Sequence, residues 1–384
     1  MKILLGCDSY TPNIDGVIIC VKNIYNCLKK LGHEVKIIVP YSKELKKINN
    51  PDIILVPAIK TIIGWKLTLP IFNYYPLYKQ LKKFKPDIIC SHSPFVIGSL
   101  ITKFGRKHNI PVVATFHTHF YDEFLKITHS KFISKCLLKS IVKVFNNANY
   151  LHVLDPLNTS TIREYAINDF GKNIIFCDNG TEYKDVPNHN EIKTFINSKY
   201  NIADNDFVFS FVGRFVQCKN IDLIIKAATK INNDHVKYFL VGDGVEMKRL
   251  RNLVSANKLN DKFIFTGIID DRALLQKIFI RTDCNILISD FDTFPLTILE
   301  AAASKTPSLM LKNYTSLIND SINGYLVDDM KIDTVKDKIN FILNDKNINL
   351  VSANAFAEIF KPRTWERKTE YLVSKYEWIL KHNK

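Results

Sequence analysis

Short apolar runs that alternate with helix-like stretches constrain the fold of this chain more than any other feature. In the first half, the stretch 18–32 has helical periodicity and stops at Gly32. The stretch 93–109 is a second helix, with Ser93 as its expected cap. Short apolar runs bounded by proline or polar residues are the expected strands; they lie at 2–8, 33–40, 52–58, 86–92 and 110–117. Strands separated by helices predict a parallel, doubly wound sheet.

The same alternation restarts in the second half. Its expected helices are 220–231 and 296–305, and its expected strands are 206–214, 236–244, 262–267 and 284–290. A length of 384 residues is also typical of two domains. We therefore predict an α/β protein with domains at 1–175 and 176–364. An amphipathic helix at 365–384 either caps the second domain or packs back on the first.

The composition is that of a globular protein, with 46% hydrophobic residues. No apolar run is long enough to span a bilayer, and the N-terminus is predicted to be a first strand rather than a secretion signal. The eight cysteines are scattered without zinc-binding spacing. We expect them to be reduced and mostly buried, which favours a cytoplasmic location.

A net charge of +15 limits the partners without identifying one. Nucleic acid, an anionic membrane and phosphorylated substrates are all compatible with it, as is compositional drift. No nucleic-acid recognition motif is present, so no nucleic-acid partner is expected.

In the expected helix 131–145, Lys131, Lys135, Lys139 and Lys143 form one stripe. The helix is either an ordinary surface helix or one that lies on an anionic, peripheral membrane surface.

Polar residues follow the strands of the first half. Gly16 is expected in a loop after the first strand, His92 follows the run 86–92, and His117 and His119 follow the run 110–117. A single histidine is more often structural. Ligands of open parallel sheets bind beyond the strand carboxyl ends, so three histidines at one rim indicate a polar binding site.

Two cations and two glycines follow strands of the second half. Arg214 and Lys219 lie at a strand-to-helix turn, where they suit a diphosphate better than solvent. Gly242 and Gly244 in "VGDG" would let a nucleotide approach the backbone, or would simply form a turn. The full dinucleotide fingerprint is absent.

The stretch "DFDTFPLTILE", residues 290–300, allows three interpretations. Asp290 and Asp292 have the spacing of a metal site. Asp292 or Thr293 could instead cap a helix that has Pro295 in its first turn. Alternatively, Asp292 and Glu300 contact different parts of one sugar nucleotide. Because Arg214 and Lys219 already supply positive charge, we expect no metal.

These motifs together resemble family 4 retaining glycosyltransferases, which have two Rossmann-like domains facing across a cleft (the GT-B architecture). The resemblance rests on the loop ending in Gly16, "LKKLGHEVKIIVP", "HSPF", "VGR…KN", "VGDG" and the acid-x7-acid motif. It covers nearly the whole chain. "ATFHTHFYDEF" and "DTFPLTILEAAASKTPSLML" are similar to bacterial members that build polysaccharides or glycolipids.

The resemblance implies a nucleotide-sugar donor, UDP-linked, and a lipid or glycan acceptor, with no other cofactor. Arg214 and Lys219 would bind the donor diphosphate, and Glu300 the ribose hydroxyls. Asp292 and His117 would lie near the transferred sugar. The remaining donor-binding candidates are Gly16, Gly242, Phe294, Pro295 and Leu296, and the acceptor-side candidates are His92 and His119.

One departure from the family is that Asp292 stands where glutamate is usual. Two rival functions also remain open. A nucleotide-sugar epimerase can share the two-domain architecture but needs no acceptor. A non-catalytic binder would hold the donor without transferring it.

Overall fold

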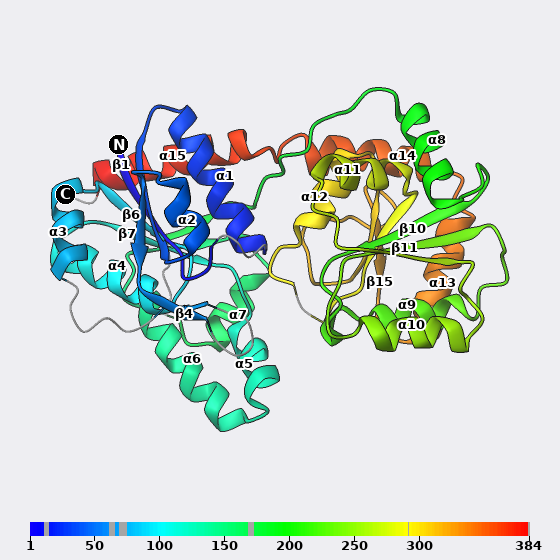
Figure 1. Cartoon of the computed structure of the whole chain (residues 1–384), viewed down its shortest axis with the longest axis horizontal. Coiled ribbons are helices and arrows are strands. Elements are labelled where there is room, and N and C mark those ends of the chain that lie inside the picture. The colour runs from blue at the N-terminus through cyan, green and yellow to red at the C-terminus, as the bar shows by residue number, and fades with distance from the viewer. Residues whose placement is uncertain (11–14, 61–65, 69–74, 168–172, 291, 383–384) are drawn as a thin grey trace. The chain divides into compact units, whose positions relative to one another are not determined.

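The computed structural model describes residues 1–10, 15–60, 66–68, 75–167, 173–290 and 292–382. It consists of two compact units (Figure 1). Unit 1 contains residues 1–180 together with 365–384, and unit 2 contains residues 181–364. The pattern of the sequence placed the first boundary a few residues earlier, after residue 175.

Unit 1 is built on a seven-stranded parallel sheet with the order β3-β2-β1-β6-β7-β8-β9. Its strands are β1 Lys2–Gly6, β2 Glu34–Pro40, β3 Ile53–Val56, β6 Ile88–Ser91, β7 Val112–Phe116, β8 Tyr150–Val153 and β9 Ile174–Phe176. A separate antiparallel pair joins β4 Ala58–Lys60 to β5 Lys66–Thr68. The helices are α1 Gly16–Lys30, α2 Lys43–Ile48, α3 Tyr75–Phe84, α4 Val96–Lys107, α5 Phe120–Thr128, α6 Lys131–Phe145, α7 Asn158–Glu164 and α15 Trp365–His382.

Unit 2 repeats this architecture with a six-stranded parallel sheet of order β12-β11-β10-β13-β14-β15. Its strands are β10 Phe207–Val212, β11 Val236–Val241, β12 Phe263–Gly267, β13 Cys284–Leu287, β14 Ser308–Leu311 and β15 Tyr325–Val327. Its helices are α8 His189–Tyr200, η2 Gln217–Lys219, α9 Ile221–Ala228, α10 Met247–Ala256, α11 Arg272–Arg281, α12 Leu296–Ala303, α13 Ile332–Leu343, α14 Ile348–Asn354 and η3 Ala355–Phe360. The α/β class with two parallel-sheet domains, expected from the sequence, is thus confirmed.

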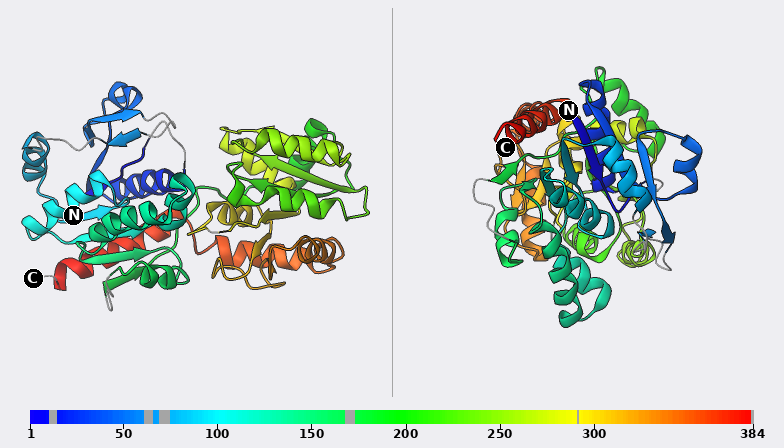
Figure 2. Two further views of the ribbon diagram at one scale, coloured as in Figure 1. Left: turned by 90° about the horizontal axis from the view of Figure 1, so that it is seen from below. Right: turned by 90° about the vertical axis from the view of Figure 1, so that its left-hand side faces the viewer.

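Helices cover both faces of each sheet, as Figure 2 shows for both units. In unit 2, α9 packs on α10 and α13, while α11 packs on α8 and α12. This covering explains why the central strands lack the alternation of a half-exposed sheet: every residue of β6 and of β13 is buried. None of the helices in the described ranges is both long and apolar enough to cross a membrane.

The C-terminal helix α15 belongs to unit 1, where it packs against α1. Its buried face carries Trp365, Leu372, Tyr376 and Ile379. Of the two positions expected for this helix, the structure therefore has the one on the first domain.

The cap of α4 differs from the sequence prediction. Ser93 does not cap the helix; the carboxylate of Asp8 does, accepting hydrogen bonds from the backbone of Ile97 at 2.8 Å and Gly98 at 3.3 Å. Ser93 Oγ donates to the same carboxylate at 2.8 Å. Asp8 follows β1, so this buried carboxylate joins the end of β1 to the start of α4 and satisfies two N–H groups of its first turn.

We predict that Asp8→Ala lowers the free energy of unfolding by about 2 kcal/mol, because it leaves buried N–H groups without an acceptor. Ser130→Ala is the matched control, since Ser130 caps the more exposed helix α6 over a longer bond of 3.4 Å. It should cost only roughly 0.5 kcal/mol. Urea denaturation of both variants measures the difference, and equal losses would refute the role of Asp8.

Candidate active site

The strand order reverses once in each sheet, and the predicted site residues gather at these two places. In unit 1, β1 lies between β2 and β6; in unit 2, β10 lies between β11 and β13. The connections that leave two neighbouring strands at such a point run to opposite faces of the sheet. The space between them is where open α/β sheets bind ligands.

The loop after β10 carries the two predicted diphosphate-binding cations. Arg214 is exposed, and its guanidinium has no hydrogen-bond or ion-pair partner among the described residues. Lys219 ends the short helix η2, and its Nζ lies 2.8 Å from both carboxylate oxygens of Asp292. The tertiary structure thus brings Lys219 and Asp292 together, and Arg214 remains available for an anion.

The stretch 290–300 differs from its sequence prediction in two respects. Strand β13 ends at Leu287, so Asp290 lies beyond the strand instead of closing it. Pro295, not Asp292 or Thr293, is the residue directly before α12, and its own side chain makes no capping hydrogen bond. The two aspartates also have different partners, since Asp290 accepts from Asn220 at 2.6 Å whereas Asp292 pairs with Lys219.

Helix α12 begins directly after the predicted donor-binding residues Phe294 and Pro295, with Leu296 as its first residue. The first backbone N–H groups of a helix lack partners within the helix and favour an anion. The N-terminus of α12, which closely follows Asp292 in the chain, is therefore a place where a phosphate or a sugar hydroxyl can accept hydrogen bonds.

Gly242 has a packing reason that the sequence did not reveal. Its φ is +135°, and a Cβ at this position would come within 1.9 Å of the carbonyl oxygen of Gly213. Any larger residue at 242 would therefore collide with the β10 loop. Whether Gly242 also contacts a nucleotide remains a prediction.

Glu300 lies in α12 and is buried. Its Oε1 accepts a bond of 2.5 Å from Arg272 Nη2, and Arg272 Nε bonds Glu182 at 2.8 Å. The guanidinium also stacks over the ring of Tyr183, at 4.7 Å from the ring centroid. Sequence reasoning missed Arg272, Glu182 and Tyr183, because no local motif relates them to Glu300.

In unit 1, Gly16 was expected in a loop. It is instead the exposed first residue of helix α1. Asp15 caps this helix by accepting from the backbone N–H of Ile18 at 2.8 Å. Residues 11–14 of the preceding motif lie outside the described residues. Gly16 is thus placed at a helix N-terminus that already has a carboxylate cap.

The structure brings together two of the three predicted histidines. His92 Nδ1 lies 3.1 Å from His117 Nε2, whereas His119 Nε2 lies 3.0 Å from Asn158 Oδ1. Burial lowers the pKa of His92 to about 3, and burial together with His92 lowers the pKa of His117 well below its usual value. Both imidazoles are therefore neutral near pH 7. His92 is buried, so of the two it is the half-buried His117 that can exchange a hydrogen bond with an incoming hydroxyl.

Cys20 lies beside this pair. One ligand atom from each of Cys20, His92 and His117 lies within 4.8 Å of the others, and in the described ranges this is the one such group that could hold a metal ion. The sequence does not predict this group, because its three residues come from distant stretches of the chain. All eight cysteines are free, and seven are buried, as expected; Cys136 is exposed.

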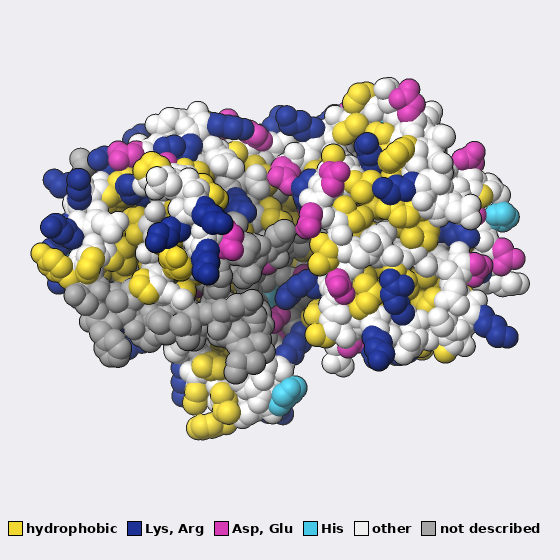
Figure 3. Space-filling model, in the orientation of Figure 1, with side chains coloured by type: hydrophobic (Ala, Val, Ile, Leu, Met, Phe, Trp, Pro, Cys, Tyr) yellow, Lys and Arg dark blue, Asp and Glu magenta, His cyan; other side chains and the backbone are white. Residues whose placement is uncertain are grey.

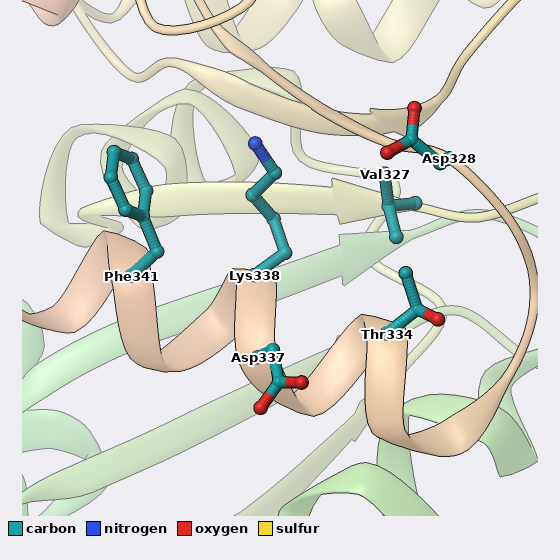
Figure 4. Close-up of a pocket in the computed structure, with 6 residues that line it drawn as sticks. All are labelled: Val327, Asp328, Thr334, Asp337, Lys338 and Phe341. Atoms are coloured by element: carbon teal, nitrogen blue, oxygen red, sulfur yellow. The ribbon is translucent and has the colours of Figure 1, made fainter.

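A separate pocket lies between β15 and α13 in unit 2 (Figure 4). Its lining includes Asp328, Asp337 and Lys338, and Lys338 forms an ion pair with Asp320 at 3.0 Å. None of the predicted site residues lines this pocket. It therefore adds nothing to the candidate site.

We predict a pH-dependent stability from the buried histidines. The folded-state pKa is lowered by burial to about 3 for His92 and about 4 for His152, against 6.5 for an ordinary histidine. Between these values the unfolded chain binds protons that the native protein does not. Each histidine therefore stabilises the fold fully above pH 6.5 and loses about 2 kcal/mol of that contribution between pH 7.5 and 5.

Urea denaturation at several pH values tests this. His152→Gln should make the fall in unfolding free energy between pH 7.5 and 5 smaller by about 2 kcal/mol. The control His382→Gln, at an exposed position, should leave the fall unchanged. An identical pH dependence in the wild type and His152→Gln would contradict the prediction.

The sequence of this chain matches two family models. "Glycosyltransferase Family 4" matches residues 14–156, and "Glycosyl transferases group 1" matches residues 192–358. The first match therefore falls within unit 1 and the second within unit 2.

Two relatives are similar to this chain over most of their length. The alpha-monoglucosyldiacylglycerol synthase of Acholeplasma laidlawii is 25% identical over 377 residues, 92% of each chain. The GDP-mannose-dependent alpha-mannosyltransferase of Corynebacterium glutamicum is 26% identical over 99% of this chain and 89% of its own.

Among solved structures, HepE of Anabaena in complex with UDP has a TM-score of 0.80 at 17% identity. The match covers 98% of this chain and 100% of HepE. At this identity the likeness concerns the fold. With both family models matched in order along the chain, this protein belongs to the glycosyltransferases that join a Family 4 domain to a group 1 domain.

Proposed function

We propose that this glycosyltransferase transfers a hexose from a UDP-sugar to the hydroxyl of a diacylglycerol-type lipid, with retention of the anomeric configuration. The single observation that carries the donor side is the exposed cation Arg214 after β10, which has no partner among the described residues and precedes Lys219 in the same loop. The lipid acceptor is suggested by the Acholeplasma laidlawii synthase. UDP is suggested by the complex of HepE.

In this proposal, Arg214 and Lys219 bind the donor diphosphate. Lys219 is neutralised by Asp292 in the unliganded protein, so it must share its ammonium between Asp292 and the phosphate when the donor binds. Asp292 then contacts the transferred sugar, Glu300 the ribose, and the N–H groups at the start of α12 the phosphate or sugar hydroxyls.

The proposed reaction breaks the bond between the anomeric carbon and the diphosphate oxygen, and forms a bond from the acceptor oxygen to the same carbon. The acceptor proton passes to the leaving diphosphate on the same face of the sugar. Negative charge grows on the diphosphate as it leaves, and Arg214, Lys219 and the helix N-terminus are arranged to stabilise it. These groups supply positive charge without a metal, so we expect activity to survive chelation.

His117 is proposed to contact the transferred sugar from unit 1. As a neutral imidazole it can accept or donate one hydrogen bond at each nitrogen, and one nitrogen already lies next to His92. His92 would hold the ring orientation, which makes it a supporting residue for His117.

An epimerase of the same architecture and a donor-binding protein without catalysis are the alternatives. The epimerase would convert the sugar nucleotide without an acceptor, and the binding protein would only hold it. The two relatives are named as a monoglucosyldiacylglycerol synthase and a mannosyltransferase, and both names favour transfer. Product analysis with and without diacylglycerol separates the three functions, because only a transferase makes a glycolipid.

We predict that the wild type converts UDP-glucose and diacylglycerol in mixed micelles to an α-linked glucolipid, identified by its anomeric NMR coupling. Arg214→Ala and Lys219→Ala should each lower turnover by roughly 10²- to 10³-fold, because each removes a preorganised group that stabilises developing charge. Turnover in excess EDTA should match that of the untreated enzyme.

Lys346→Ala is the control, since it removes an exposed cation between α13 and α14, outside the candidate site. Near-normal turnover of both Arg214→Ala and Lys219→Ala would overturn the proposed site. A β-linked product would overturn retention, and a free epimerised sugar nucleotide would favour the epimerase. Activity lost in EDTA and restored by magnesium would overturn metal independence.

Helix α6 supports a peripheral membrane location on the cytoplasmic face. All four lysines of the stripe at 131, 135, 139 and 143 are exposed. Beside them, the apolar side chains of Phe132, Ile133 and Leu137 are 78%, 48% and 39% exposed. Yellow apolar and dark blue basic side chains adjoin at the lower edge of unit 1, where α5 and α6 lie (Figure 3).

An ordinary surface helix buries its apolar face, and α6 does so only in its second half, through Ile141, Val144 and Phe145. Its first half exposes large apolar residues next to lysines, a combination that suits the boundary of an anionic bilayer. A lipid acceptor would also be reached from such a surface.

We predict that Lys135→Glu/Lys139→Glu weakens binding to phosphatidylglycerol-containing vesicles by tenfold or more, since each cation near an anionic surface contributes roughly 1 kcal/mol. Lys248→Glu/Lys258→Glu makes the same charge change in unit 2 and should bind as the wild type does. Vesicle flotation with and without phosphatidylglycerol measures the effect. Equal binding by the two double variants would exclude α6 as the membrane contact.

A further inference from the structure

Arg272, the first residue of α11, contacts three other side chains: Glu182, Tyr183 and Glu300. Its backbone position is fixed because Asp271 caps the helix, accepting from Ala273 and Leu274. The guanidinium donates to Glu182 from Nε and to Glu300 from Nη2, and its central carbon lies 4.7 Å from the centroid of the Tyr183 ring. A guanidinium that donates to two carboxylates and also contacts an aromatic ring has little freedom to rotate.

Glu300 depends on this contact. The side chain is 7% exposed, and a buried carboxylate without a partner carries a large desolvation cost. Its Oε1 takes the bond from Arg272, and within the described part of the chain its Oε2 has no hydrogen-bond partner. Arg272 therefore fixes one oxygen of the carboxylate while the other can still accept from a ligand.

We propose that Arg272 is a positioning residue for the nucleoside half of the donor, holding the Glu300 carboxylate so that Oε2 accepts from a ribose hydroxyl. The inference rests on the proposed function, in which Glu300 binds the ribose. Arg272 acts through Glu300, and the four residues Arg272, Glu182, Tyr183 and Glu300 all belong to unit 2.

The charges around Glu300 support this role. Burial raises the pKa of Glu300, the guanidinium of Arg272 opposes that rise, and Glu182 adds to it. Two further elements pack on α12: β14 carries no charged residue, and Glu358 of η3 accepts from Asn323 instead. Removing Arg272 would leave Glu300 facing Glu182 without a cation, so protonation of Glu300 would reach higher pH.

The test is the binding of UDP and of 2′,3′-dideoxy-UDP to the full chain by titration calorimetry. Arg272→Gln should weaken UDP binding roughly 10- to 100-fold, the range expected for loss of a hydrogen bond to a charged group. The loss should be larger at pH 6 than at pH 8.5, because Glu300 regains its charge as the pH rises. Binding of 2′,3′-dideoxy-UDP, which lacks both ribose hydroxyls, should be the same in wild type and variant.

Two further variants separate positioning from general effects. Arg272→Lys keeps the positive charge but cannot donate to Glu182 and Glu300 at once. Its affinity for UDP should therefore lie between those of the wild type and Arg272→Gln. If Arg272→Gln does not fold, Arg272→Lys replaces it in the test. Lys277→Gln removes a cation from the same helix outside this cluster and should bind UDP as the wild type does.

The outcomes distinguish the two hypotheses. Wild-type protein that binds UDP tightly, with Arg272→Gln equally tight at both pH values, would overturn the role of Arg272 alone. Equal weakening of UDP and 2′,3′-dideoxy-UDP would overturn it as well, since the loss would not act through the ribose. Wild-type protein that does not bind UDP would overturn both the proposed UDP donor and this inference.

Discussion

Parallel strand pairing at β1–β6 and at β10–β13 is the constraint on which the rest of each unit depends. Neighbouring parallel strands end at the same edge of the sheet, so the residues that directly follow these strands lie at that edge. In unit 1, Asp8 follows β1 and His92 follows β6. In unit 2, Arg214 follows β10 and Asp292 follows β13. The carboxylate of Asp8 strengthens the arrangement because it ties the end of β1 to the first turn of α4.

The candidate donor-binding residues are held in opposite-charge pairs in the unliganded protein. Lys219 pairs with Asp292, and Arg272 pairs with Glu300. Each carboxylate is largely removed from water, and each has a cation that offsets the cost of its burial. Arg214 differs, because it is exposed and without a partner among the described side chains. An arriving diphosphate would therefore meet one free cation and one that it must share.

The sequence predicted the fold well because strand and helix identity here follows local pattern. The apolar runs at β6 and β13 are buried on both faces, and the helix 131–145 has the predicted bounds. Local prediction failed at the caps and ends. Ser93 was expected to cap α4, and Asp290 to end a strand, but Asp8 caps the helix and β13 stops at Leu287. A cap supplied from a distant part of the chain leaves no local signal.

The sequence by itself determined the two parallel-sheet domains, the cations after β10, the acid-x7-acid spacing and the lysine stripe of α6, since all of these follow from residue order and helical or strand period. Only the tertiary structure decided which side chains meet. It paired His92 with His117, Lys219 with Asp292 and Arg272 with Glu300, and it exposed Phe132 beside the lysines. The physical reason is that charge pairing and burial depend on contacts between segments far apart in the chain, and no spacing in the sequence encodes those contacts.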